Sequence, residues 1–318
     1  MRSSGRRREL LEGLAALRAV FAHRMLRRAE LGFAFAWTSE WAFTIGLGVV
    51  AFRAGGATAV GVVALLRMVP SALLSPILLA VADRVRRERV LVWVSLGRAV
   101  ALGYTAAALH EGAPPEVIYA LAIVSTVAMT LFRPAHSALL PALCATTREL
   151  TSANVVRGLL DAAGTLVGPA LAGVVLAASG ATAVFGSAAA LSLAAAAVLQ
   201  RIRYEAPAPA AASHDDPTPS LARDTADGVR AVAAHPDLRL VFGLGFAQTF
   251  IRGALNVLTV VVAFDLIDSG EPGVAVLSAA ALSATGSGEA VESAGAASVL
   301  SVGADAGRTT GSGSACAI

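Results

Sequence analysis

The sequence predicts an all-α membrane protein, and its composition and the spacing of its apolar residues support this. Of its 318 residues, 56% are hydrophobic and 15% are charged, and the mean hydropathy is +0.69. Soluble domains carry about 25% charged residues, so this chain has too little polar surface for a water-soluble fold. Its apolar residues fall into runs of about 20, the length of helix that spans a bilayer core.

The first segment, residues 1–28, holds eight arginines beside apolar residues at helical spacing. This pattern is typical of an amphipathic helix on an anionic membrane surface, and it suits a cytosolic helix packed on the bundle equally well. No A-x-A-type cleavage site closes the first apolar run. We therefore interpret residues 1–28 as a cytoplasmic leader rather than a signal peptide.

Seven apolar runs follow the leader, separated by breaks rich in glycine, proline or charge. The six runs within residues 29–200 predict a six-helix transmembrane bundle. A polar linker, residues 201–238, separates this bundle from the seventh run. The expected spans are 30–52, 57–81, 90–109, 116–137, 154–178, 182–200 and 239–267.

The last part of the chain changes in composition. Residues 239–282 hold the seventh helix and the start of an eighth, and residues 283–318 form a low-complexity tail of the kind that is usually disordered. Because the change falls inside the expected eighth helix, we expect a frameshift near codon 280 or a natural truncation. The exclusive use of Arg over Lys indicates a GC-rich coding sequence, which favours the frameshift.

The placement of arginine predicts the topology. With the N-terminus inside, 18 of the 25 arginines fall on the cytoplasmic side, and the outer loops hold Arg53 alone. The positive-inside rule then predicts a multi-pass protein of the plasma (inner) membrane with a cytoplasmic N-terminus. The arginines flank apolar runs without interleaved aromatic residues, which argues against nucleic acid as a partner.

Five ionisable residues lie inside expected spans, away from the span ends: Glu40, Arg67, Arg98, Asp161 and Arg252. Such a group costs at least about 2.5–3.5 kcal/mol at bilayer depth, so it faces a cavity or a partner. From the helical rise, Glu40 and Arg67 each lie roughly 15 Å from opposite surfaces and meet near the midplane. Glu40 is therefore either half of a structural ion pair or a protonation site that biases two conformations.

The other three intramembrane charges have separate interpretations. Arg157 lies one helical turn before Asp161 and is its expected neutralising partner. Arg98 is expected to satisfy polar groups in the bundle interior, and Arg252 is a candidate ligand for an anionic substrate.

Small residues recur at helical spacing in the fifth span, in the run G-T-L-V-G-P-A-L-A-G. Gly164 and Gly168 share one helix face, where small residues let two backbones approach closely, and Pro169 permits a bend. With Gly173, these residues predict a helix-packing hinge. Between the second and third spans, the loop A-D-R-V-R-R-E-R places Asp83 before an arginine cluster, and topology alone does not explain that acid.

These two motifs resemble those of the major facilitator superfamily. The glycine run is similar to its fifth-helix antiporter signature, G-xxx-G-P-xx-G-G, with Ala172 at one glycine position. Asp83, Arg84 and Arg87 match its loop motif, G-x-L-A-D-R-x-G-R-R. Leu79, Arg86 and Glu88 stand where that loop motif has glycine, glycine and arginine.

Further segments resemble the bacterial branch related to siderophore and drug exporters. R-P-A-H-S-A-L-L-P and R-E-L-T-S-A-N-V-V are similar to the stretch that joins its helices four and five. R-G-A-L-N-V-L and F-D-L-I-D-S-G-E-P-G are similar to its seventh helix and the following loop. The resemblance covers about residues 29–282. It implies a six-helix N-terminal half of a major-facilitator-type bundle plus one or two helices of the second half.

The resemblance also implies a function, which is proton-coupled export of a drug-like or siderophore-like small molecule. Glu40 and Asp161 are then the proton-coupling candidates, and Asp83 with Arg84 and Arg87 forms the cytoplasmic gate. The alternative is a non-transporting truncated remnant or a half-size membrane subunit. The expected partners are the lipid bilayer, protons and a small molecule that the sequence does not specify.

No pattern in the sequence indicates catalysis or a metal site. Cys144 and Cys316 are far apart, and the five histidines are scattered among loops and helix ends. Neither set has metal-ligand spacing, and no Ser/His/Asp arrangement converges. We therefore expect a protein that is not an enzyme and that needs no cofactor.

Overall fold

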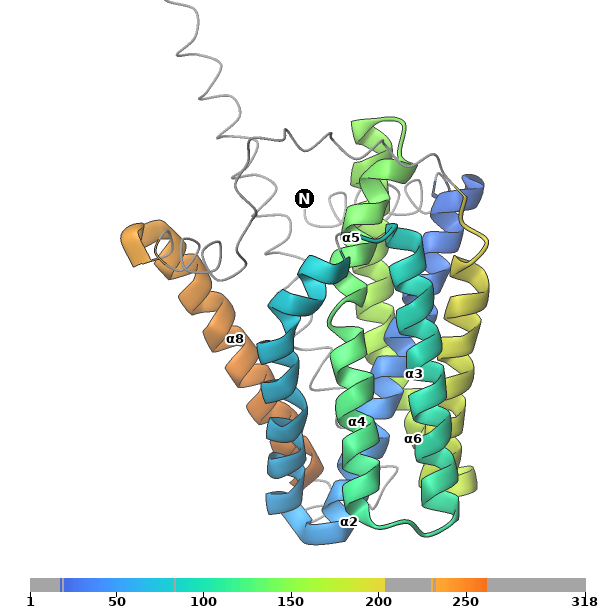
Figure 1. The fold of residues 1–318 in the computed structure, drawn as a ribbon, viewed down its shortest axis with the longest axis vertical. Coiled ribbons are helices and arrows are strands. Elements are labelled where there is room, and N and C mark those ends of the chain that lie inside the picture. Colours follow the sequence, from blue (N-terminus) through green and yellow to red (C-terminus); the bar gives the residue numbers. More distant parts are fainter. Residues whose placement is uncertain (1–17, 19, 83, 204–229, 231–232, 262–318) are drawn as a thin grey trace, which may run out of the picture.

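The computed structural model of the protein describes residues 18, 20–82, 84–203, 230 and 233–261, and in this part of the chain it is built from α-helices (Figure 1). The predicted all-α fold class is therefore confirmed. The helices are α2 (Arg24–Ala82), α3 (Arg87–His110), α4 (Pro115–Met129), α5 (Phe132–Leu143), α6 (Thr147–Leu199) and α8 (Pro236–Val261).

Two of these helices cross the bundle twice. The 59-residue α2 is interrupted at Gly55 and Gly56, and the 53-residue α6 at Gly180. Gly56 and Gly180 have φ angles of 62° and 77°, a backbone conformation that side chains disfavour. Figure 1 shows that each helix runs along the bundle and returns, so each supplies two of the expected spans.

The fourth span differs from the sequence expectation, which was one helix over residues 116–137. The chain instead forms α4 and α5, with a turn at residues 130–131, and α5 continues to Leu143. Pro134 is the physical reason. It has no N–H to donate to the carbonyl of Thr130 four residues earlier, so the helical hydrogen-bond ladder is interrupted there.

Four stretches of the described chain are long and apolar enough to cross a membrane. Because α2 and α6 fold back on themselves, these four stretches make six passages. α8 packs along α2 and lies on the outer side of the second arm of α2 in Figure 1. The stretches are Arg24–Ala80, Arg87–His110, Pro115–Leu143 and Thr147–Leu199.

Several predicted regions fall outside the described residues. They comprise most of the leader and of the linker, the start of the expected eighth helix and the tail. Asp83 is also outside the described residues. For these parts of the chain, the sequence expectations stay predictions.

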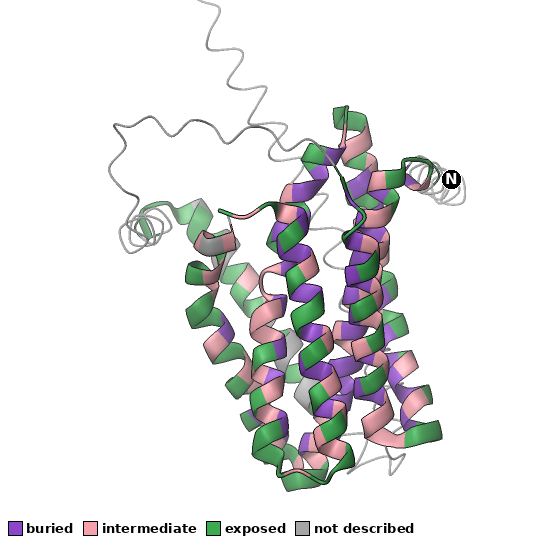
Figure 2. Ribbon diagram, turned by 45° about the vertical axis from the view of Figure 1, so that its right-hand side comes forward, coloured by how far each residue is buried: buried purple, intermediate pink, exposed green. Residues whose placement is uncertain are grey.

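The core lies between α2, α3, α4, α5 and α6. Phe43, Leu102 and Phe185 are fully buried in one cluster, and Phe33 and Phe132 are buried in a second. Figure 2 shows that buried residues gather on helix sides facing one another and that exposed residues cover the outside. Many of the exposed residues are large and apolar, as expected where lipid replaces water as solvent.

A seam of small residues brings α6 against the first arm of α2. A Cβ added at Gly168 would lie 2.5 Å from the Cβ of Trp41 and 2.9 Å from the carbonyl oxygen of Thr38. A Cβ at Gly164 would lie 2.8 Å from Cδ1 of Trp37. The two glycines therefore allow the close backbone approach that their spacing predicts.

The other two residues of the predicted hinge are buried in the same helix. Pro169 and Gly173 lie inside α6, and the residue of α6 with non-helical backbone angles is Gly180. The bend therefore sits eleven residues beyond Pro169, at the reversal rather than within the glycine seam.

We predict that Gly168→Ala lowers the unfolding temperature of the protein in detergent, because the new methyl group overlaps the α2 backbone. Overpacking of this kind costs about 1–3 kcal/mol. Gly158→Ala is the matched control on the same helix, since a Cβ there meets no atom within 4 Å. It should leave the thermal unfolding curve unchanged or shift it upward by improving helix propensity. Equal destabilisation by both variants would show that the seam is not tightly packed.

Candidate functional site

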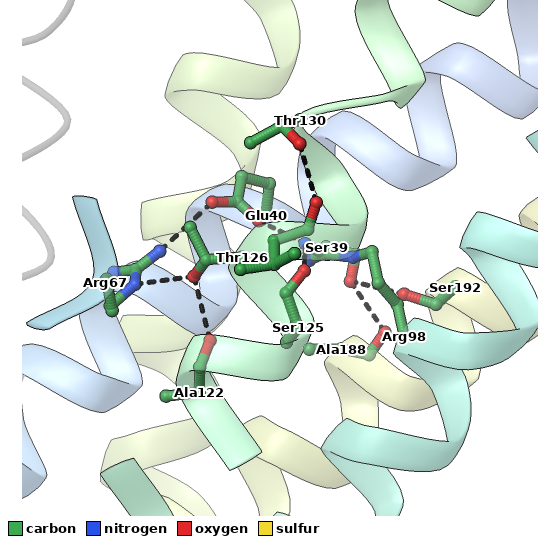
Figure 3. Close-up of polar contacts among 11 residues, drawn as sticks. Ser39, Glu40, Arg67, Arg98, Ala122, Ser125, Thr126, Thr130, Ala188 and Ser192 are labelled. Carbon is green, nitrogen blue, oxygen red and sulfur yellow. Dashed lines mark hydrogen bonds and ion pairs between the residues drawn. The ribbon is translucent and has the colours of Figure 1, made fainter. Parts of the chain in front are cut away.

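The charged cluster around Glu40 joins three passages of the bundle (Figure 3). Glu40 lies on the first arm of α2, Arg67 on the second arm and Arg98 on α3. Arg67 Nη2 donates to Glu40 Oε1 at 3.2 Å, and Arg98 Nη1 donates to Glu40 Oε2 at 2.6 Å. The ion pair expected between Glu40 and Arg67 is therefore present, and Arg98 is a second partner.

α4 supplies the fourth wall of the cluster. Arg67 Nε donates to Thr126 Oγ1 at 2.8 Å, and Arg98 Nη1 also donates to the carbonyl oxygen of Ser125 at 3.3 Å. The guanidinium carbon of Arg67 lies 4.6 Å from the ring centroid of Phe43, a distance typical of a cation–π contact. Both arginines are thus held by groups that do not depend on the charge of Glu40.

The three charged groups differ in exposure. The side chain of Arg98 is 1% exposed, whereas those of Glu40 and Arg67 are 16% and 14% exposed. Among the described residues, Arg98 Nε and Nη2 have no hydrogen-bond partner. Two guanidinium groups share one carboxylate, so the cluster carries one net positive charge while Glu40 is ionised. Glu40 and Arg67 are therefore the partly exposed members of the cluster.

A neutral polar link lies beside the charged cluster and was not predicted from the sequence. Ser39 Oγ donates to the carbonyl oxygen of Ala188 at 2.7 Å and lies 2.9 Å from Ser192 Oγ. Both serines are buried. This link ties α2 to the second arm of α6 one residue away from Glu40. The sequence signal was weak, because single serines in apolar runs often bond only to their own helix.

Asp161 has a different ion-pair partner from the one expected. Arg133 Nη2, from α5, donates to Asp161 Oδ1 at 2.7 Å. The expected partner, Arg157, donates instead to Ser137 Oγ at 2.6 Å. The guanidinium carbon of Arg133 also lies 4.1 Å from the ring centroid of Trp37. The expectation considered one helix only, and the bundle supplies a nearer cation from a neighbouring helix.

The remaining predicted site residues lie elsewhere. Arg84 is exposed in the turn between α2 and α3, and Arg87 begins α3. The gate motif cannot be completed, because Asp83 lies outside the described residues. Arg252 lies on α8, and its side chain is outside the described part of the structure. The structure thus brings together Glu40, Arg67 and Arg98.

A scan against family models identifies the family. Residues 30–303 match the model of the Major Facilitator Superfamily. The chain belongs to the Major Facilitator Superfamily. This match covers most of the 318 residues and extends beyond residue 282, where the resemblance seen in the sequence ends. No curated protein matches the chain. The family assignment makes the chain a multi-pass membrane protein of the major facilitator transporter type.

We predict that Glu40 and Arg98 are strongly coupled in stability. Unfolding of Glu40→Gln, Arg98→Gln and the double variant in detergent gives a double-mutant cycle, and groups in one buried network typically couple by about 0.5–3 kcal/mol. The matched cycle uses Asp161→Asn and Arg133→Gln, a pair in which Arg133 is 45% exposed. Exposed pairs couple by less than about 1 kcal/mol. A coupling energy for Glu40 and Arg98 no larger than that of the control pair would contradict the prediction.

Proposed function

We propose that this protein exports a small molecule, of the drug or siderophore-like class, in exchange for protons, with Glu40 as the proton carrier. The observation that carries the proposal is the sharing of one partly exposed carboxylate by two arginines from different passages of the bundle. A structural ion pair would need only one arginine. A carboxylate that holds two can change the packing of both when it binds a proton.

Protonation of Glu40 has a defined physical consequence. Ionised Glu40 makes charge-assisted hydrogen bonds to Arg67 and Arg98, and these are roughly twice as strong as neutral ones. A protonated carboxyl group weakens both bonds and leaves two guanidinium groups facing each other without a counter-charge. Their repulsion in a medium of low dielectric favours separation of the second arm of α2 from α3. Proton occupancy then biases two arrangements of the helices, as alternating access requires.

Asp161 is the second proposed proton carrier. Its partner, Arg133, is more exposed than either arginine of the Glu40 cluster, so solvent screens this pair more. We therefore assign Glu40 the larger effect on the coupling. The lower exposure of the Glu40 cluster supports this order.

The other predicted elements complete the proposal. The arginine distribution supports a cytoplasmic N-terminus. Asp83, Arg84 and Arg87 form the cytoplasmic gate, and the seam from Gly164 to Gly173 is the surface on which α6 moves against α2. The tight approach at Gly164 and Gly168 supports this last role.

We predict that Glu40→Gln abolishes transport driven by a proton gradient and retains exchange without one. The full chain is reconstituted in liposomes with an imposed pH gradient, and uptake of a panel of cationic, neutral and anionic fluorescent compounds is followed. Gradient-driven uptake should fall at least tenfold, because a carboxamide cannot bind and release a proton at neutral pH. Equilibrium exchange of the same compound across the membrane should continue. It reports an intact substrate site.

Ser39→Ala is the matched control, because Ser39 is the buried neighbour of Glu40 and bonds to α6 rather than to the arginines. It should keep both activities. Full gradient-driven uptake by Glu40→Gln would rule out its role as proton carrier. If the folded wild-type chain transports no compound in either assay, the alternative of a non-transporting membrane protein or a half-size subunit is favoured.

A further inference from the structure

A pocket lined by arginines lies away from the Glu40 cluster, at the end of the bundle where α3 begins and α6 ends. It has a volume of about 470 Å³ and is widely open to the surface. Its walls come from the first turns of α3 and from residues 200–203 after α6. The residues that matter for its chemistry are Arg86, Arg89, Trp93, Ile202 and Arg203.

The pocket carries excess positive charge. Three arginines line it together with one acid, Glu88, whose Oε1 lies 2.5 Å from Nε of Arg86. Arg89 and Arg203 are both exposed, and no acidic side chain of the described residues forms an ion pair with either. The N-terminus of α3 adds the positive end of a helix dipole. Guanidinium groups in this setting favour a phosphate group, which they bind through paired hydrogen bonds.

The pocket lies at the level of the membrane surface. α3 has 24 residues, about 36 Å at the helical rise, so its two ends reach the two interfaces. Trp93 lies roughly 9 Å from the start of α3 by the same rise, and its side chain is 63% exposed. Tryptophan is enriched at this depth because its ring is apolar and its N–H is polar.

An apolar face of α3 continues from the pocket toward the bilayer centre. Trp93, Leu96, Val100 and Tyr104 are all exposed, and their spacing places them on one side of the helix. Leu193 is exposed on α6, which packs against α3. The cationic pocket thus has an apolar surface directly below it, roughly 16 Å long from Trp93 to Tyr104.

We propose that this pocket binds the phosphate headgroup of an anionic phospholipid whose acyl chains lie along the exposed face of α3. Basic pockets between membrane helices are suited to such headgroups. A soluble phosphate compound would use the arginines but would leave the apolar face without a role. The combination of an arginine-lined cavity and a continuous apolar face therefore selects a lipid.

The test uses Trp93 as a reporter of the lipid beside it. The full chain is reconstituted in phosphatidylcholine vesicles that contain brominated phosphatidylglycerol or the same fraction of brominated phosphatidylcholine. Quenching is measured in the wild-type chain and in Trp93→Phe, and the difference between the two is the quenching of Trp93. Brominated phosphatidylglycerol should quench Trp93 more strongly. Arg89→Gln/Arg203→Gln should reduce this preference at least about fivefold, corresponding to the roughly 1 kcal/mol that one basic residue contributes at an anionic surface.

Arg27→Gln/Arg148→Gln is the matched control, because it removes two exposed arginines at the same end of the bundle but outside the pocket. It should keep the preference for phosphatidylglycerol. Equal quenching by the two brominated lipids, or equal loss of preference in both double variants, would overturn the proposal.

Inorganic phosphate, compared with chloride at equal ionic strength, should leave the quenching unchanged. Relief of quenching by phosphate would identify a soluble phosphate ligand instead of a lipid. These outcomes do not depend on transport activity.

Discussion

One carboxylate, Glu40, is shared by two guanidinium groups in the interior of the bundle. Breaking a buried ion pair by removal of one partner costs about 3–5 kcal/mol, because the remaining charge is left without compensation. Arg67 and Arg98 therefore tie the second arm of α2 and α3 to the first arm of α2. Thr126 and Ser125 extend this network to α4. This acid therefore lies at the centre of a network that spans four passages.

The packing around the first arm of α2 links this network to the rest of the bundle. Trp37 lies one helical turn before Glu40, and its ring contacts the guanidinium of Arg133 on one side of the network. A Cβ at Gly164 would touch the same ring. Asp161, paired with Arg133, is thereby mechanically connected to the arm that carries Glu40. A shift of α6 along its glycine seam would move the surroundings of both acids together.

The parts of the fold that depend on local rules could be predicted from the sequence. The length of the apolar runs predicted the passages through the membrane. The helical rise per residue predicted that Glu40 and Arg67 lie at the same depth, where they form an ion pair. The ion pair of Asp161 with Arg133 depends on how α5 sits beside α6, and a spacing rule within one helix cannot find a partner on another helix. The superfamily could be predicted from the order of its motifs along the chain. Pro134 indicates the break between α4 and α5, but the fourth span was predicted from the length of its apolar run alone.

The reversals at Gly56 and Gly180 also determine which backbone is exposed at the end of the bundle opposite the arginine-lined pocket. Each reversal takes only one or two glycines between two helical arms, so the described chain adds no long loop at either corner. The other connection on that side is the four-residue turn 111–114 between α3 and α4. This end of the bundle, formed by Gly56, Gly180 and the turn 111–114, therefore exposes very little extended backbone to a protease or an antibody. An epitope tag inserted at residues 111–114 would be the least disruptive handle for determining which compartment this end of the bundle faces.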